Sequence, residues 1–360
     1  MARLMPDGGY RSKSAVRAAP LERCGPNGDT IRLRRGASLY VEPMLHVLAD
    51  RRRIARAVRV LRRRLAGLPV RDVTITWHGG GKAKGDIAWL REHAFWWRHD
   101  PTLLGTRHWL VFGHAPDTPT RTETITCEIN LLHGGADRRV AGAILRDEDD
   151  ALYLAHSGKI GGARVGLRKR AFRDFAATGN WQAARWPDGS STELLVIGPL
   201  EGPRLPRQVG RFVSAVHRFK SGDGSIAALD SATPAPADSD VSHAMSAACD
   251  RPLVLDALAE ELARRGLSAK GGGDPLFTPR RVAPPLLEIA TDPGRDRIER
   301  AVGRLLLRRV GANGAAAILI VPEAARASLI EAVGPAGVHV VGYHWRAARP
   351  VFDGLDAALH

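Results

Sequence analysis

Two hydrophobic periods alternate along the 360 residues and predict most of the elements. The clearest helical period lies in residues 51–66, where Ile54, Val58, Leu61 and Leu65 recur on one face. Further helices are predicted over 86–98, 167–176 and 207–219. Alternating or continuous apolar segments predict strands over 37–42, 70–76, 107–112, 122–132, 140–145, 151–156 and 193–197. We therefore expect residues 37–220 to form a mixed α+β domain with an antiparallel sheet.

The pattern changes at residues 221–248, which are small, polar and rich in Pro and therefore typical of a flexible linker. Beyond it, helices are predicted over 253–265, 296–309 and 323–332, and strands over 274–279, 282–289, 315–321 and 338–343. This alternation is typical of an α/β layer with a mixed sheet. We expect an irregular basic arm (1–36), the α+β domain (37–220), the linker (221–248) and a second domain (249–360).

Composition excludes several classes of protein. Hydrophobic residues make up 44% of the chain, yet no apolar run approaches the roughly 20 residues of a membrane helix. The N-terminus lacks the apolar segment of a signal peptide, so we expect a cytoplasmic protein without membrane contact. Cys24, Cys127 and Cys249 stand far apart, which excludes a thiolate zinc site of the usual spacing and fits a reducing compartment.

The net charge of +15 is concentrated near the N-terminus. Residues 1–75 carry 17 Arg and Lys against 6 Asp and Glu, which is +11 of the total. The chain has 46 Arg and 7 Lys, so a compositional bias explains Arg over Lys, but it does not explain the position of the excess. A localised excess of this size indicates contact with a polyanion, and DNA is the expected partner.

Helix 51–66 carries the best candidates for phosphate contact. Eight Arg and no acidic residue cover the face opposite its apolar stripe, and such a face repels itself unless an anion neutralises it. The candidate residues are Arg51, Arg52, Arg56, Arg59 and Arg63. The alternative for any run of charges is a solvated face.

Two Gly-rich turns offer further cations. His78 to Asp86 contains Lys82 and Lys84, but neither is followed by the Ser or Thr of a P-loop. A turn that opens a helix can still hold phosphate through backbone N–H groups, and the segment around Arg168, Lys169 and Arg170 has the same property. A plain turn is the alternative for both.

The segment Pro285 to Thr291 is the candidate for chemistry. Metal-dependent phosphodiester hydrolysis needs carboxylates that converge on Mg²⁺. Asp274 precedes one predicted short strand, and Glu288 lies near the end of another. Residue 290 faces the same side of the strand as Glu288, and there a Lys would orient the attacking water, but this chain has Ala290.

Leu286-Leu287-Glu288-Ile289-Ala290-Thr291 resembles the Leu-Phe-Glu-Val-Lys-Thr strand of PD-(D/E)XK, restriction-endonuclease-like domains in uncharacterised bacterial proteins. The downstream segments 302–306, 319–323, 340–343 and 352–355 also match, so the resemblance covers about residues 250–356. It departs at two positions, where Ala290 replaces the Lys and Arg304 replaces a helix Gln.

The resemblance implies a Mg²⁺- or Mn²⁺-dependent endonuclease, in bacteria a defence against foreign or modified DNA. Asp274 and Glu288 would hold the metal, and Lys270 would stabilise the transition state; Arg280, Arg281 or Arg304 are substitutes. One site per chain would need a homodimer to cut both strands. The alternatives are a fold that has lost catalysis and binds or scaffolds DNA, and a module whose basic face binds an acidic protein.

Weaker patterns in the first half have ordinary explanations beside functional ones. Six Trp residues offer stacking on an unpaired base or simple core packing: Trp89, Trp96, Trp97, Trp109, Trp181 and Trp186. Glu128 with the acidic residues 147–150 suggests either a second metal site or a solvated turn. His108, His114, His133 and His156 lack metal-ligand spacing and are interpreted as structural.

Overall fold

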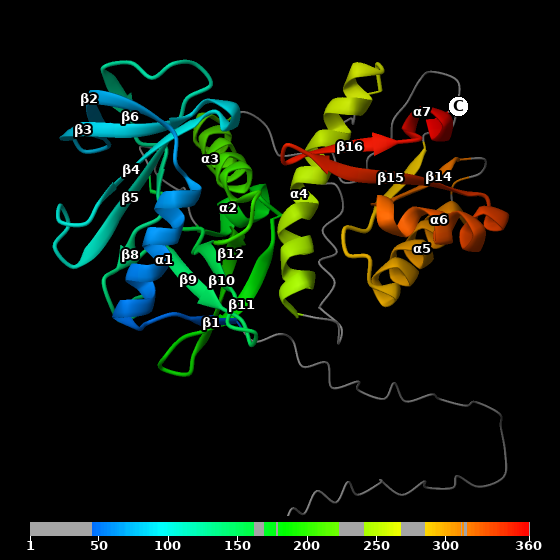
Figure 1. Cartoon of the computed structure of the whole chain (residues 1–360), viewed down its shortest axis with the longest axis horizontal. Coiled ribbons are helices and arrows are strands. Elements are labelled where there is room, and N and C mark those ends of the chain that lie inside the picture. Colours follow the sequence, from blue (N-terminus) through cyan, green and yellow to red (C-terminus); the bar gives the residue numbers. More distant parts are fainter. Residues whose placement is uncertain are drawn as a thin grey trace, which may run out of the picture. The chain divides into compact units, whose positions relative to one another are not determined.

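The computed structural model describes residues 45–161, 169–177, 179–222, 241–267, 285–310, 312 and 315–359 (Figure 1). The predicted arm 1–36 and the predicted strands 37–42 and 274–279 lie outside these residues. The fold combines helices with several sheets, as the sequence indicates. None of the described helices is both long and apolar enough to cross a membrane.

The first sheet is a closed barrel of five short strands. Its members are β1 (Leu45–Val47), β9 (Gly142–Arg146), β10 (Leu152–His156), β11 (Trp181–Arg185) and β12 (Ser191–Pro199), in the order β1-β11-β12-β10-β9. Strand β1 closes the barrel because it pairs parallel with β11 and antiparallel with β9. The prediction of an antiparallel sheet was therefore wrong at β1, which pairs parallel with β11 and is too short to show a hydrophobic period.

The second sheet has seven strands in the order β6-β2-β3-β4-β5-β7, and β8 pairs with β5. The strands are β2 (Leu68–Trp77), β3 (Gly81–Leu90), β4 (Phe95–Asp100), β5 (Arg107–His114), β6 (Thr122–Thr124), β7 (Cys127–Glu128) and β8 (Leu131–Leu132). The single strand expected over 122–132 is thus divided into three. The pairing of β2 with β6 is parallel, which is a second departure from an antiparallel sheet.

The helix predicted over 86–98 was wrong, because this segment contains β3, a 3-10 turn (Arg91–His93) and β4. Trp89 lies opposite Trp96 across the two strands, and both are buried in the same cluster with Trp109. Trp97 points to the other face and packs with Leu65. The sequence does not show this period of two, because the adjacent Trp96 and Trp97 are both apolar and also fit the apolar face of a helix.

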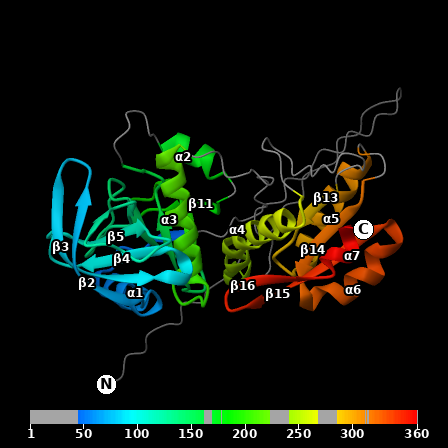
Figure 2. The same cartoon turned by 90° about the horizontal axis from the view of Figure 1, so that it is seen from above.

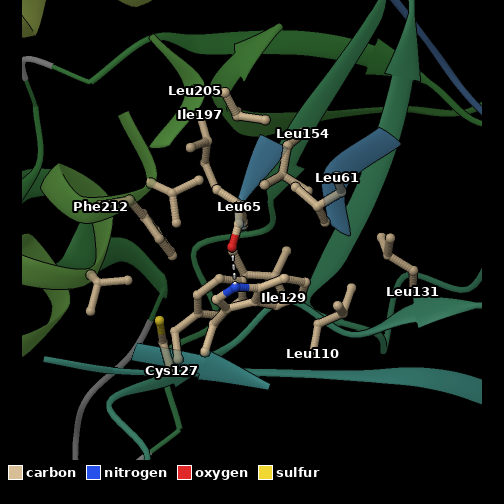
Figure 3. Packing of buried hydrophobic residues seen from close by; sticks show 14 of the residues in the cluster. Leu61, Leu65, Leu110, Cys127, Ile129, Leu131, Leu154, Ile197, Leu205 and Phe212 are labelled. Carbon is tan, nitrogen blue, oxygen red and sulfur yellow. Dashed lines mark hydrogen bonds between the residues drawn. The ribbon is translucent and has the colours of Figure 1, made fainter. Parts of the chain in front are cut away.

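Three helices cover the sheets of the first half. They are α1 (Arg51–Arg64), α2 (Lys169–Phe175) and α3 (Leu205–Ser221), close to their predicted positions. Figure 3 shows Leu61 and Leu65 at the end of α1 against Leu110, Leu131 and Leu154, with Phe212 of α3 nearby. The Nε1 of Trp97 donates to the Leu65 carbonyl oxygen at 2.7 Å, which fixes the end of α1 on the seven-stranded sheet.

Helix α4 (Val241–Arg264) begins inside the segment predicted as linker, so that prediction was wrong for residues 241–248. Met245 and Cys249 of α4 are buried in a cluster with barrel residues, and the Asn180 amide nitrogen contacts both sulfur atoms at 3.3 Å. The helix therefore starts where its apolar side chains contact the barrel, and small residues of the sequence concealed this.

The C-terminal sheet has the order β13-β14-β15-β16, with the first three strands parallel and the last antiparallel. The strands are β13 (Leu286–Ile289), β14 (Ala317–Pro322), β15 (Val338–Arg346) and β16 (Arg349–Asp353). Helices α5 (Arg295–Val310) and α6 (Glu323–Val333) cover one face, and α4 and α7 (Leu355–Leu359) cover the other (Figure 2). A 3-10 turn, Gly334–Ala336, follows α6.

Candidate functional site

The arginine face of α1 is exposed as the sequence predicts. Ile54, Ala57, Val58, Val60 and Leu61 are buried, while Arg51, Arg52, Arg56, Arg59, Arg62, Arg63 and Arg64 are exposed. The helix begins at Asp50, whose side chain accepts from the Arg53 backbone N–H at 2.8 Å. Arg62, Arg63 and Arg64 occupy the last turn, where cations interact favourably with the helix dipole.

Of the eight arginines of α1, Arg53 is the one that has an acidic partner in the described part of the chain. Its guanidinium lies 2.7 Å from the Asp150 carboxylate, which Arg146 also contacts at 3.2 Å. The seven exposed arginines make no hydrogen bond or ion pair with any described residue. The face therefore keeps a dense positive charge that the surrounding fold does not neutralise.

Lys82 and Lys84 lie on β3 and are exposed. They pair with Thr76 and Thr74 of β2, so all four side chains share one face of the sheet. The turn at Gly79 and Gly80 joins two strands, and therefore the helix N-terminus expected here is absent from the described structure. Any phosphate contact at this place would depend on the lysine ammonium groups alone.

The second basic turn is only partly described, because Arg168 lies outside the described residues. Lys169 is half-buried, and its Nζ donates to the Glu193 carbonyl oxygen at 2.8 Å. Arg170 is exposed and lies 4.0 Å from Asp174. Lys169 thus has a structural role, and Arg170 is the freer of the two for an anion.

Glu288 is buried in β13, with only 4% of its surface exposed. It lies on the face covered by α5, where Leu286 and Ala290 are also buried, so residues 288 and 290 share a side as expected. Arg304 of α5 donates to Glu288 Oε1 from Nε at 3.1 Å and from Nη2 at 2.6 Å. Arg308, one turn later, lies 3.5 Å from Glu288 Oε2.

A third guanidinium belongs to the same electrostatic group. Burial lowers the pKa of Arg251 in α4, while the Glu288 carboxylate raises it and the Arg304 charge lowers it. One carboxylate thus interacts with three arginines. Arg251 and Arg308 were not singled out in the sequence, although Arg308 stands four residues after Arg304 and therefore on the same helix face.

The resemblance implies a metal ion at Glu288, and the geometry of this residue does not fit one. Both carboxylate oxygens lie within 3.5 Å of a guanidinium, so a divalent cation would have to displace two charged partners. Asp274 and Lys270 lie outside the described residues. Over the ranges that are described, no three or more His, Cys, Asp and Glu side chains are grouped to hold a metal.

The two departures from the motif explain each other. Arg304 stands where the helix Gln is expected and supplies the cation that neutralises Glu288. Ala290 fills the position of the expected Lys with a buried methyl group, 7% exposed. A Lys there would add another charge to a group that already has an excess of cations.

The weaker patterns have mainly structural roles. Each of the six tryptophans proposed for stacking is at most 9% exposed and belongs to the core. Asp147 accepts from the Tyr153 hydroxyl at 2.7 Å, whereas Glu128 accepts from the Asn130 amide at 2.5 Å, so these carboxylates do not converge. His108 bridges His99 and His133 at 3.0 and 3.3 Å through its two ring nitrogens, which forms a chain rather than a ligand cage.

Comparisons of this chain with protein-family models, with curated proteins and with solved structures found no match.

Proposed function

We propose that this protein binds DNA through the exposed arginine face of α1. We further propose that its C-terminal sheet is a restriction-endonuclease-like layer that scaffolds the complex without cleaving DNA. The observation that carries the first proposal is the set of seven exposed arginines without a described acidic partner. The Glu288–Arg304 ion pair carries the second.

The size of the arginine face suits a duplex. Arg52, Arg56, Arg59 and Arg63 lie at helical spacing opposite the buried stripe. At about 1.5 Å per residue this row is roughly 16 Å long. Duplex DNA carries about one negative charge per 1.7 Å of its axis, so several phosphates lie within reach of the row. The mutual repulsion of these arginines falls when phosphates replace solvent around them.

The test is the salt dependence of DNA binding, measured by fluorescence anisotropy with a labelled duplex. The wild type should show a steep linear fall of log affinity with log salt concentration. The double variant Arg56→Gln, Arg59→Gln should reduce the magnitude of that slope by about two, since each lost phosphate contact contributes about 0.9. The matched control changes two exposed arginines elsewhere, Arg91→Gln and Arg346→Gln, and should keep the slope.

An acidic protein is the competing partner for the same face. If the wild type binds no duplex even at low salt, the DNA proposal fails, and the acidic-partner alternative takes its place. If both double variants reduce the slope equally, DNA binds but α1 is not the contact surface.

The endonuclease remains a second candidate because β13, α5 and β14 follow each other as the resemblance implies, with β13 and β14 adjacent and parallel. We expect plasmid DNA to remain supercoiled with the protein and Mg²⁺ or Mn²⁺, since Glu288 is held by arginines. Nicking by the wild type that disappears in Glu288→Ala would overturn the scaffolding proposal and support cleavage. A preparation in which both proteins nick equally contains a contaminating nuclease.

A further inference from the structure

A cavity of about 680 Å³ lies between the seven-stranded sheet and the barrel. Its walls come from the end of β2, residues 124–128, the segment after β10 and the end of α3. This volume is within the roughly 300–1,000 Å³ of small-molecule sites in proteins. Neither the arginine face of α1 nor the Glu288 group contributes to its walls.

Two charged side chains in the cavity have unused hydrogen-bonding capacity. Glu128 is held by the Asn130 amide at Oε2, and the Asn130 oxygen accepts from the Leu110 N–H at 3.1 Å. Glu128 Oε1 and the half-buried Lys220 ammonium have no hydrogen-bond partner among the residues described. The two groups influence each other electrostatically but form no contact within 4.0 Å. The cavity thus offers one fixed acceptor and one donor.

Lys159 is a third charged side chain of the wall, and its ammonium donates to the Arg138 carbonyl oxygen at 2.9 Å. The hydroxyls of Thr76 and Thr124 lie 3.0 Å apart at one end of the cavity, whereas the ring of the neighbouring Trp77 packs against Trp109 on the other face of the sheet. His156 is fully buried: its Nδ1 accepts from the Gly158 N–H, and it also bonds the Glu128 backbone. Burial lowers the pKa of His156 to about 4, so this ring adds no charge at neutral pH.

These groups select a class of ligand. The Glu128 carboxylate disfavours a polyanion, and the Lys159 and Lys220 ammonium groups disfavour a metal cation. A neutral planar ring with both donors and acceptors on its edge satisfies both Glu128 and Lys220. Nucleobases have this chemistry.

The face that leads to the cavity suits the backbone of the same ligand. Thr76 lines the cavity and pairs with Lys82 in the β2–β3 ladder, so the exposed Lys82 lies beside it on the same face. Thr124 of β6 pairs with Thr76 and extends this polar face. A strand that crosses this face would place phosphates near Lys82 while one base enters the cavity.

We propose that this cavity binds a single unpaired or extruded nucleobase of the DNA, with Glu128 and Lys220 contacting its hydrogen-bonding edge. The inference rests on the proposed DNA-binding function and adds a base-reading site to it. A base inside a duplex cannot reach such a site unless it leaves the stack, and a base that is already unpaired does so at least cost.

The test uses two labelled DNA duplexes of equal length in anisotropy titrations. One carries a single bulged base, tried with each of the four bases, and the other carries an abasic residue at the same place. The wild type should bind at least one bulged duplex about tenfold more tightly than the abasic duplex. Lys220→Met and Glu128→Gln should each bring this ratio close to one, with affinity for the abasic duplex changed far less.

Arg91→Met is the charge-matched control for Lys220→Met and should leave the ratio as in the wild type. Equal binding of bulged and abasic duplexes by the wild type overturns the inference, as does an unchanged ratio in both pocket variants. In either case the DNA-binding proposal stands. Failure of the wild type to bind any duplex at low salt overturns both. The wild-type ratio needs no variant, so a variant that fails to fold leaves the test intact.

Discussion

Arg304 donates two hydrogen bonds to one oxygen of Glu288, at 3.1 and 2.6 Å, across the interface between α5 and β13. The Glu288 side chain is 3% exposed and the Arg304 side chain 30% exposed, so solvent screens this pair only in part. Charge-assisted bonds of this kind are about twice as strong as neutral ones. The pair therefore fixes the register of α5 on the sheet.

Glu288→Gln should lower the free energy of unfolding by about 3 kcal/mol, because it removes the carboxylate to which the partly buried Arg304 guanidinium donates two hydrogen bonds. The measurement is urea denaturation. The control is Arg295→Gln, which removes an exposed pair with Glu299 and should cost less than about 1 kcal/mol. Either of two results would contradict this assignment. One is a Glu288→Gln protein as stable as the wild type, and the other is stabilisation by Mg²⁺ of the wild type but not of Glu288→Gln.

Gly113→Ala and Gly303→Ala should have opposite effects. A Cβ at Gly113 in β5 would lie 2.1 Å from the buried Trp96 ring, whereas a Cβ at Gly303 in α5 meets nothing within 4 Å. We expect Gly113→Ala to destabilise by about 2 kcal/mol through overpacking, and Gly303→Ala to stabilise by up to about 1 kcal/mol through helix propensity. Thermal unfolding of both proteins checks the signs, and a stable Gly113→Ala would show that Trp96 has room to move.

Asp250 joins α4 to α3 through two guanidinium bonds from Arg204, one of them 2.8 Å long, and Gln208 adds a third bond at 3.1 Å. The Arg204 guanidinium also lies 4.5 Å from the centre of the Trp345 ring. Asp250→Ala should cost about 3 kcal/mol, since the group is 5% exposed.

Two matched variants, Arg204→Lys and Arg349→Lys, test whether the planar guanidinium of Arg204 contributes to stability. Arg204→Lys should lose about 1–2 kcal/mol, because an ammonium replaces neither the bidentate bond nor the planar stacking. Arg349 pairs with Glu260 at the exposed surface, so its replacement by Lys should change the free energy of unfolding by less than about 1 kcal/mol. Equal losses in the two Lys variants would show that the planar guanidinium of Arg204 is not needed.

The pH dependence of stability should carry the signature of His156. Burial lowers its pKa from 6.5 to about 4, so the unfolded chain binds a proton that the folded chain does not between these values. The free energy of unfolding is therefore highest above pH 6.5 and falls by about 1 kcal/mol per pH unit from this group as the pH decreases towards 4. Urea denaturation at a series of pH values should show a shallower fall in His156→Asn. The same slope in both proteins would mean that folding leaves the pKa of His156 near its ordinary value of 6.5.

The sequence predicted those elements whose hydrophobic period is long enough to read. Helices α1, α3 and α5 and strands β5, β10 and β14 lie within a few residues of their predicted positions. Strand β1 was missed because its three residues are too few for a period, and β11 was missed because its two buried residues, Trp181 and Ala184, are three positions apart and do not alternate. The helix expected at 86–98 failed because Trp96 and Trp97 are both apolar but enter two different clusters.

The candidate site was predictable in its residues but only partly in its geometry. The exposed arginines of α1 follow directly from the opposite placement of Ile54 and Arg56 on one helix. Arg304, the partner of Glu288, lies on the helix that follows β13, so this ion pair joins two elements that are neighbours in the sequence. The cavity brings together Glu128 and Lys220, which are about 90 positions apart in the sequence, and no local period encodes this.

Strand β1 has a consequence for the order in which the chain folds. Leu45 pairs with Ala184 and His46 with Arg146, so both neighbours of this strand are synthesised long after it. During translation its backbone groups stay without their partners until β11 has left the ribosome. Because such non-local pairings close slowly, we expect barrel closure to be the late step of folding. A chain truncated before residue 181 would expose the edges of β1 and β10 and be prone to aggregate.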